Sequence, residues 1–208
     1  MLKNKILTGF LTLSVLGTIN AQEQNNEKSV YVKANAVFLP IGILNAAVEH
    51  QISKKYTVQA DVFISPWKSF AGHKLQNYSI GVEGRYYFNE AFKHWYIGAN
   101  ITGSAFNLQK WNYWNDNISE SEDGLTSHIN SNLYQKGYSI ALGVTGGYQF
   151  QLSDRWNMDI YATVGTSQGF YKGYDRSTGE RYDSADRYNK SGEIIPYRGG
   201  VMISYKLK

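Results

Sequence analysis

A repeated alternation of apolar and polar residues constrains the fold of this chain more than any other feature. In the segment 77–88, Ile80 and Val82 fall on one face, whereas Glu83 and Arg85 fall on the other. Such a period of two residues is typical of a β-strand whose two faces meet different environments. The pattern occurs in eight segments, which are 30–39, 43–52, 56–65, 77–88, 95–106, 138–151, 156–167 and 197–207.

The lengths and end residues of these segments favour strands that cross a membrane. Most are close to the roughly 9–11 residues that a tilted transmembrane strand requires. Aromatic residues lie at both ends of the apolar face, as in the two interfacial girdles of membrane barrels. A soluble β-sandwich also alternates, but its solvated face would carry more lysine and glutamate. One expected girdle contains Tyr56, Tyr86, Phe88, Trp95, Tyr148, Phe150, Trp156 and Tyr205, and the other contains Phe38, Tyr78, Tyr138 and Tyr197.

The connections between the segments alternate in length. Short turns are expected at 53–55, 89–94 and 153–155, and long loops at 66–76, 107–137 and 170–192, with 40–42 as a tight exception. Short inner turns and long outer loops are typical of bacterial outer-membrane proteins. The sequence therefore predicts an all-β fold, an eight-stranded antiparallel up-and-down transmembrane β-barrel with short periplasmic turns and long outer loops.

The first residues have the pattern of an export signal. Lys3 and Lys5 precede an apolar run at 6–16, and Ala21 precedes a polar stretch. A basic start, a short apolar run and a small residue indicate a cleaved signal peptide. We expect a signal peptide at 1–21, a short segment at 22–29, and a barrel at 30–208 located in the cell outer membrane.

Composition excludes several classes of site. The chain has no cysteine, so disulfides, thiolate metal sites and cysteine nucleophiles are ruled out. The formal net charge is +4 and no Lys/Arg cluster is present, so we expect no nucleic-acid partner. We also expect no cofactor and no bound metal. The expected partners are outer-membrane lipid, the barrel-assembly machinery and an external protein or glycan.

Seven charged residues fall on the polar faces and would point into the barrel. A narrow eight-stranded barrel is filled by side chains, and an unpaired charge inside it would be costly. We therefore expect a network of salt bridges, with a gated pore or proton path as the functional alternative. The residues are Lys33, Glu49, Asp61, Glu83, Arg85, Asp159 and Arg198.

The two longest loops are rich in aromatic residues and arginine. These residue types dominate binding hot spots, so the loops are candidates for recognition of an external ligand. Alternatively, the aromatic side chains extend the outer girdle and pack loop against loop. The candidates are Trp111, Trp114, Tyr134, Tyr171, Tyr174, Arg176, Arg181, Tyr182 and Arg187.

The largest loop also allows two other hypotheses, a hydrolytic site and a metal site. Ser127 and His128 lie beside Glu122 and Asp123, which could form a hydrolytic site if the fold oriented them as a triad. The acidic stretch 116–123, with Asp116 and Glu120, offers oxygen ligands for Ca²⁺, although it lacks the spacing of an EF-hand loop. We favour a solvated loop and a chain that is not an enzyme.

Several short stretches resemble an uncharacterised outer-membrane β-barrel family, a domain of unknown function often encoded near fimbrillin-type genes. They are KANA at 33–36, GVEGRYYF at 81–88, HWYIG at 94–98, GYQF at 147–150, LSDRWN at 152–157 and ISYKL at 203–207. The resemblance spans about 30–208 without the two long loops. It implies a fold and a location but no activity. The C-terminus departs from common bacterial barrels because it does not end on an aromatic residue.

The expected function is that of a non-enzymatic outer-membrane barrel that anchors and displays surface loops, for envelope structure or for recognition and adhesion. The alternatives are a small channel or transport barrel and, less favoured, a lipid-modifying or proteolytic outer-membrane enzyme.

Overall fold

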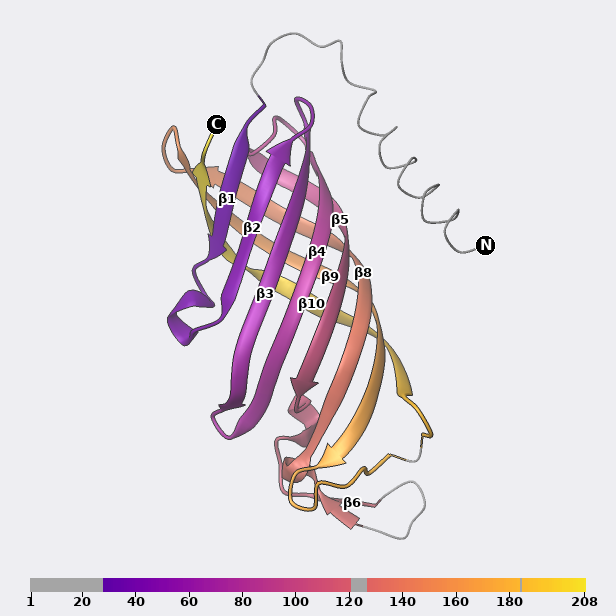
Figure 1. The fold of residues 1–208 in the computed structure, drawn as a ribbon. Coiled ribbons are helices and arrows are strands. Elements are labelled where there is room, and N and C mark those ends of the chain that lie inside the picture. The colour runs from indigo at the N-terminus through magenta and orange to yellow at the C-terminus, as the bar shows by residue number, and fades with distance from the viewer. Residues whose placement is uncertain (1–27, 121–126, 184) are drawn as a thin grey trace, which may run out of the picture.

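A computed structural model describes residues 28–120, 127–183 and 185–208. Eight antiparallel strands close into one barrel in which each strand pairs with its neighbours in the chain and β1 pairs with β10 (Figure 1). Within the described residues, no helix has the length and apolar character needed to cross a membrane. The barrel strands are β1 (Val30–Asn35), β2 (Leu44–Gln51), β3 (Tyr56–Phe70), β4 (His73–Tyr87), β5 (His94–Leu108), β8 (Leu133–Gln151), β9 (Trp156–Asp175) and β10 (Asn189–Lys206).

The remaining elements are short and lie in the connections. Three 3-10 turns are η1 (Leu39–Ile41), η2 (Trp111–Tyr113) and η3 (Asn130–Asn132). A small hairpin joins β6 (Ile118–Glu120) to β7 (Ser127–Ile129). The sequence did not predict this hairpin, because its strands are too short to show a period.

The apolar face of each strand points outward and the polar face points inward, as the alternation predicted. On β4, Ile80 is 65% exposed on the outside, whereas Glu83 is 0% exposed on the inside. The same division holds around the ring, where valine, leucine and isoleucine side chains form an outer apolar band and polar side chains fill much of the interior. The prediction of an all-β ring of eight antiparallel strands is confirmed.

Several strand limits differ from the prediction. β3 continues to Phe70 and β4 begins at His73. The loop expected at 66–76 is therefore a tight turn at Ala71 and Gly72. β8, β9 and β10 likewise extend into the expected long loops, whereas β1 stops at Asn35. In these extensions the ladder hydrogen bonds continue past the segments that the alternation of apolar and polar residues had marked.

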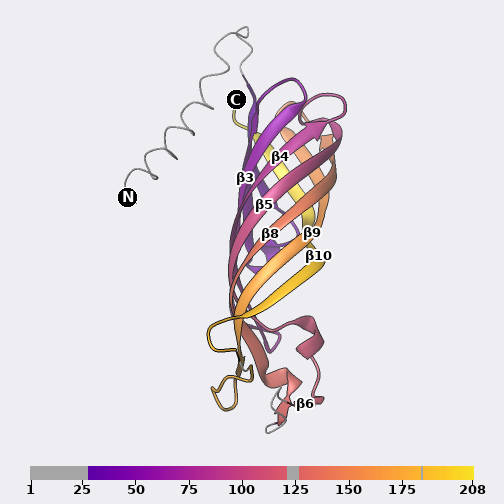
Figure 2. The ribbon, with the colours of Figure 1, turned by 90° about the vertical axis from the view of Figure 1, so that its right-hand side faces the viewer.

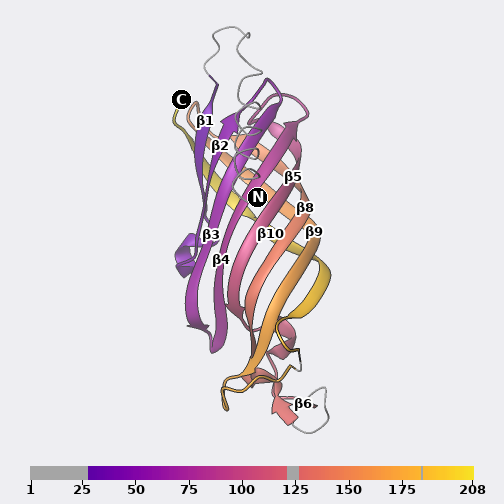
Figure 3. The same ribbon diagram turned by 45° about the vertical axis from the view of Figure 1, so that its right-hand side comes forward.

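The two ends of the barrel differ. The turn end carries the short connections 52–55, 88–93 and 152–155 together with the C-terminus, and the loop end carries η2, η3, β6 and β7 (Figures 1 and 2). The strands tilt around the barrel, most clearly β8, β9 and β10 (Figure 3). Rings at the turn end contact one another in pairs, including Tyr56 with Tyr86, Trp95 with Tyr148, and Trp156 with Tyr205.

Part of the sequence prediction lies outside the described residues. This applies to the signal peptide at 1–21, to residues 22–27 of the following segment, and to Glu122 and Asp123 of the acidic loop.

Candidate functional site

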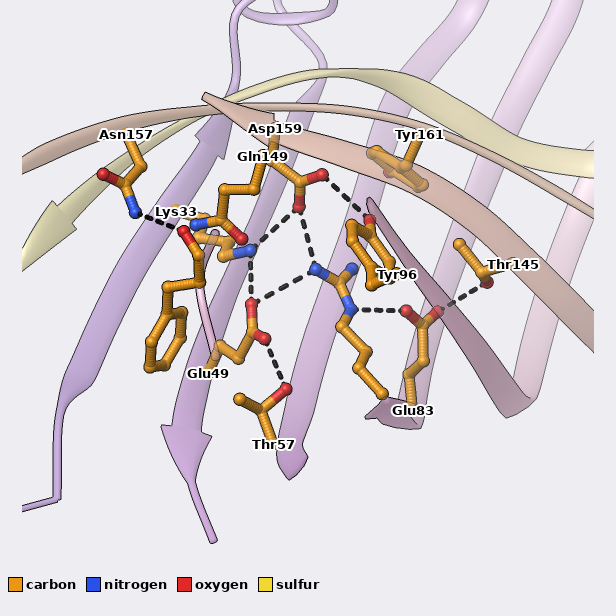
Figure 4. Close-up of polar contacts among 12 residues, drawn as sticks. Lys33, Glu49, Thr57, Glu83, Tyr96, Thr145, Gln149, Asn157, Asp159 and Tyr161 are labelled. Carbon is orange, nitrogen blue, oxygen red and sulfur yellow. Dashed lines mark hydrogen bonds and ion pairs between the residues drawn. The ribbon is translucent and has the colours of Figure 1, made fainter. Parts of the chain in front are cut away.

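Arg85 is the centre of a fully buried charge network inside the barrel. Figure 4 shows its partners Glu49, Glu83 and Asp159 around one polar cluster. Its Nε lies 2.6 Å from Glu83 Oε1. Its Nη1 lies 3.2 Å from Glu49 Oε2 and 2.8 Å from Asp159 Oδ2. Lys33 Nζ forms ion pairs with Glu49 and Asp159, and it lies 2.9 Å from Asp159 Oδ2. These residues come from β1, β2, β4 and β9, so the network joins strands across the interior.

A second layer of ion pairs lies beside the first. Arg198 on β10 reaches Asp61 Oδ1 at 2.6 Å and Glu83 Oε2 at 3.2 Å. Glu83 thereby links Arg198 to Arg85. The structure thus brings together all seven charged residues that the sequence placed in the lumen, four carboxylates against three cations.

Neutral side chains add hydrogen bonds to the network. Tyr87 donates its hydroxyl to Glu49 at 2.9 Å, and Tyr96 donates to Asp159 at 2.9 Å. The ring of Tyr96 also lies under the Arg85 guanidinium, 4.5 Å from its centroid. Gly147 makes room for this ring, because a Cβ there would lie 2.4 Å from it. Small residues opposite large ones let a narrow barrel pack its interior.

A cluster of aromatic rings, which we call the aromatic plug, closes the barrel between the charge network and the turn end. Phe92, in the turn between β4 and β5, is 4% exposed and contacts the rings of Tyr31 and Tyr87. Asn157 donates a hydrogen bond to its carbonyl at 3.2 Å. The sequence analysis missed this role. The signal was a phenylalanine between the charged residues Glu90 and Lys93 in a short turn, which is typical of a residue that folds back into a core.

The half of the interior toward the loop end is hollow. A cavity of about 830 Å³ begins at Asp61 and Arg198 and extends to Trp111 and Trp114. The expectation of an interior filled throughout is therefore wrong for this half, because serine, glycine and alanine at the inward positions leave space. Its polar lining includes Asn45, Asn77, Ser79, Thr102, Ser104, Gln135, Ser139, Ser167 and Ser191, and its apolar lining includes Phe38, Phe63, Phe106, Leu108 and Ile195.

Tyr197 belongs to this cavity and not to the outer girdle. The register of β10 shifts between Pro196 and Arg198, so strict alternation fails there. Such a bulge re-aims a side chain, and Tyr197 donates its hydroxyl to Asn100 inside the barrel. The prediction of an outward Tyr197 is wrong, and Pro196 was the sequence signal for the bulge.

The recognition candidates divide into exposed and packed side chains. Trp111 is 83% exposed and Trp114 is 51% exposed at the mouth of the cavity, where the Trp114 ring also stacks on His73 at 4.2 Å. Tyr134 stacks on Tyr174 at 5.5 Å.

Other candidates hold loops together. Arg176 donates to the carbonyl of Gly72 at 3.1 Å and to Asn132 at 3.2 Å. Arg181 pairs with Asp183, and Tyr182 packs against Tyr113. Tyr171 lines the cavity, and Arg187 is exposed.

The structure places a carboxylate beside the histidine of the proposed hydrolytic site, whereas the predicted partners Glu122 and Asp123 lie outside the described residues. His128 Nδ1 lies 2.8 Å from Asp175 Oδ2. Burial raises the pKa of Asp175, but hydrogen bonds from Ser177 and His128 outweigh it and hold the pKa below its usual range. Since Asp175 accepts from Ser177 at 2.6 and 2.8 Å, it orders the turn that follows β9. Among the described residues, no cluster of three His, Asp or Glu side chains could hold a metal ion.

Comparison with known proteins gives a family without an assigned activity. No curated protein matches the chain. A family model matches residues 9–207, which includes the long loops that the sequence resemblance had left out. Because this match covers almost all of the 208 residues, the chain belongs to the family described as protein of unknown function (DUF3575).

Proposed function

We propose that this protein is a non-conducting, non-enzymatic outer-membrane barrel that binds a small ligand in its loop-end cavity and displays the surrounding loops for recognition. The carrying observation is the division of the interior. Ion pairs and aromatic rings fill the turn-end half, whereas the loop-end half holds a cavity of about 830 Å³. This volume lies within the ~300–1,000 Å³ of typical small-molecule sites.

Membrane insertion is supported by the outer face. Exposed valine, leucine and isoleucine side chains form a continuous band, including Val82, Ile101 and Leu142 on adjacent strands. Aromatic side chains lie beside it at the turn end, with Trp95 63% exposed and Tyr56 54% exposed. An apolar band next to an aromatic girdle matches the surface of membrane barrels. The proposed location is the bacterial outer membrane, with the loop end outside the cell.

A channel is disfavoured by the plug. An ion crossing the barrel would have to displace Phe92 and then break the contacts of Arg85 with Glu49, Glu83 and Asp159. Each broken contact would leave a buried charge uncompensated, which is costly. The proposed resting state is therefore closed to ions.

The proposal is tested by a paired measurement on the purified protein. Unboiled protein from the outer-membrane fraction should migrate differently from boiled protein on a detergent gel, and the same sample should show no single-channel steps in a planar bilayer. Recovery as a soluble protein without a mobility shift would refute membrane insertion. Regular conductance steps from the folded form would refute the closed interior and favour the channel alternative.

A further inference from the structure

The barrel wall is incomplete beside the cavity. β1 pairs with β10 from Tyr31 with Lys206 to Asn35 with Met202, and one further hydrogen bond joins Ala36 to Val201. β2 begins at Leu44, which pairs with Ile64 of β3. Among the described residues, no strand therefore pairs with 189–200 of β10 or with 65–70 of β3 on the sides that face β1 and β2. We call this interruption the β3–β10 break.

The segment 36–43, which contains η1, covers one margin of the break. Trp67 of β3 donates its indole N–H to the carbonyl of Ile41 at 2.9 Å. Asn35 donates from its side chain to the carbonyl of Gly199 at 3.3 Å. The outward side chains on this segment are apolar, with Val37 53% and Leu39 48% exposed. The margin thus has the surface of a lipid contact.

The cavity reaches both flanks of the break. Phe38 and Phe63 line it on one flank, and Ile195, Pro196 and Gly199 line it on the other. A single hollow therefore extends from the barrel interior to the interruption in the wall.

The break lies at the level of the apolar band. Ile194 pairs with Thr166 and Pro196 pairs with Val164 on β9. Ile194 is 83% exposed and Val164 is 47% exposed, both on the outer face. Backbone groups that lack a strand partner are tolerated at membrane depth where they are buried in protein or line a water-filled cavity, and Pro196 has no N–H to satisfy. These features suit an edge that stays open.

The charges around the cavity are already paired, which defines the class of ligand. Arg198 is paired with Asp61 and Glu83, and Lys110 Nζ lies 2.8 Å from Glu193 Oε1. The rest of the lining combines aromatic and aliphatic side chains with hydroxyl and amide groups. Such a lining suits an apolar chain that carries uncharged polar groups, and not an ion or a free phosphate.

We propose that the β3–β10 break is a lateral opening through which an acyl chain of an outer-leaflet lipid enters the cavity. This rests on the proposed function, because the opening must face lipid. It identifies the ligand as a lipid chain that arrives from the membrane and not from the external medium. No covalent step is involved.

Photocrosslinking in lipid nanodiscs tests this route. The probe is a phosphatidylcholine with a diazirine near the end of one acyl chain, because its headgroup keeps the chain anchored in the membrane. After irradiation, mass spectrometry should find adducts on inward residues such as Phe63, Phe106 and Ile195, as well as on the outward Leu142. Adducts confined to outward residues would overturn the lateral opening.

Neighbouring residues on β8 provide a matched pair of variants. Ser139 lines the cavity, whereas Ile140 is 50% exposed on the outer face. Ser139→Trp should fill the cavity and reduce the inward adducts at least tenfold, with outward adducts unchanged. Ile140→Trp should leave the inward adducts unchanged. The heat-dependent mobility shift verifies that each variant is folded.

The outcomes separate the two proposals. An inserted, non-conducting barrel whose inward residues stay unlabelled would overturn the lateral opening and leave the proposed function standing. Inward labelling by a short-chain, water-soluble diazirine probe, but not by the phosphatidylcholine, would also overturn it. A soluble or conducting protein would overturn the proposed function itself.

Discussion

Arg85 shows how single residues determine the state of the interior. Its guanidinium contacts Glu49, Glu83 and Asp159, which come from three different strands, and all four side chains are fully buried. Arginine suits this position because its planar group presents several fixed N–H donors and stays charged. A network of this kind gives limited net stability, but it becomes costly when one partner is lost.

Replacement of Arg85 by methionine should strongly destabilise the barrel. The substitution keeps an apolar stem but leaves buried carboxylates without their central cation, a loss of about 3–5 kcal/mol in the free energy of unfolding. Urea unfolding of the refolded protein, followed by the heat-dependent mobility shift, measures this value. Arg155→Met is the control, because Arg155 is exposed and bonds to Tyr205, and its unfolding midpoint should not move. Equal midpoints for the two variants would contradict the proposed role of Arg85.

At the scale of elements, the short turn between β4 and β5 acts as a structural plug. It is a connection of six residues, 88–93, in which Phe92 has a positive φ of 67°. This backbone conformation is uncommon for a non-glycine residue, and it is held by burial of the ring against Tyr31 and Tyr87. The turn therefore belongs to the core of the barrel and not merely to its surface.

Phe92→Ala should remove the plug and lower the free energy of unfolding by about 3–5 kcal/mol, the usual cost of deleting a buried phenylalanine ring. The same urea titration measures it. Leu152→Ala, in a turn at the same end where Leu152 is 58% exposed, is the matched control and should have a much smaller effect. If Phe92→Ala were as mild as the control, the turn would not close the barrel.

At the scale of the whole molecule, the outer apolar band distinguishes a membrane barrel from a soluble one. Val82 lies at the middle of the apolar face of β4 and is 48% exposed, between Ala60 and Ile101 on the neighbouring strands. A charged substitution at an exposed valine is tolerated when that valine faces water, but it is destabilising when the valine faces lipid at the bilayer midplane.

Val82→Arg should destabilise the barrel by about 2–4 kcal/mol in a bilayer, measured by urea titration in phospholipid vesicles. Ile118→Arg is the control, because Ile118 is 72% exposed in a loop-end hairpin, and its unfolding should be unchanged. A tolerated Val82→Arg would show that this face meets water.

The alternation of side chains alone identified the strands and their faces, since a strand in a closed barrel must separate its two surfaces. It therefore predicted eight antiparallel strands and the seven inward charges, from Lys33 on β1 to Arg198 on β10. Alternation could not set the ends of β3, β4 and β8–β10, because ladder hydrogen bonds carry these strands past the residues whose apolar and polar pattern marked them.

Three features required the tertiary structure. Phe92 closes the barrel through contacts with Tyr31 and Tyr87, which are distant in the sequence. Tyr197 turns inward because the ladder between β9 and β10 shifts by one residue. The cavity and the β3–β10 break exist because short β1 and β2 stand beside longer strands. The local sequence pattern determined which face of its strand each side chain takes. Which parts of the interior are filled and which are open depends on the lengths and registers of the strands, and only the closed ring decides these.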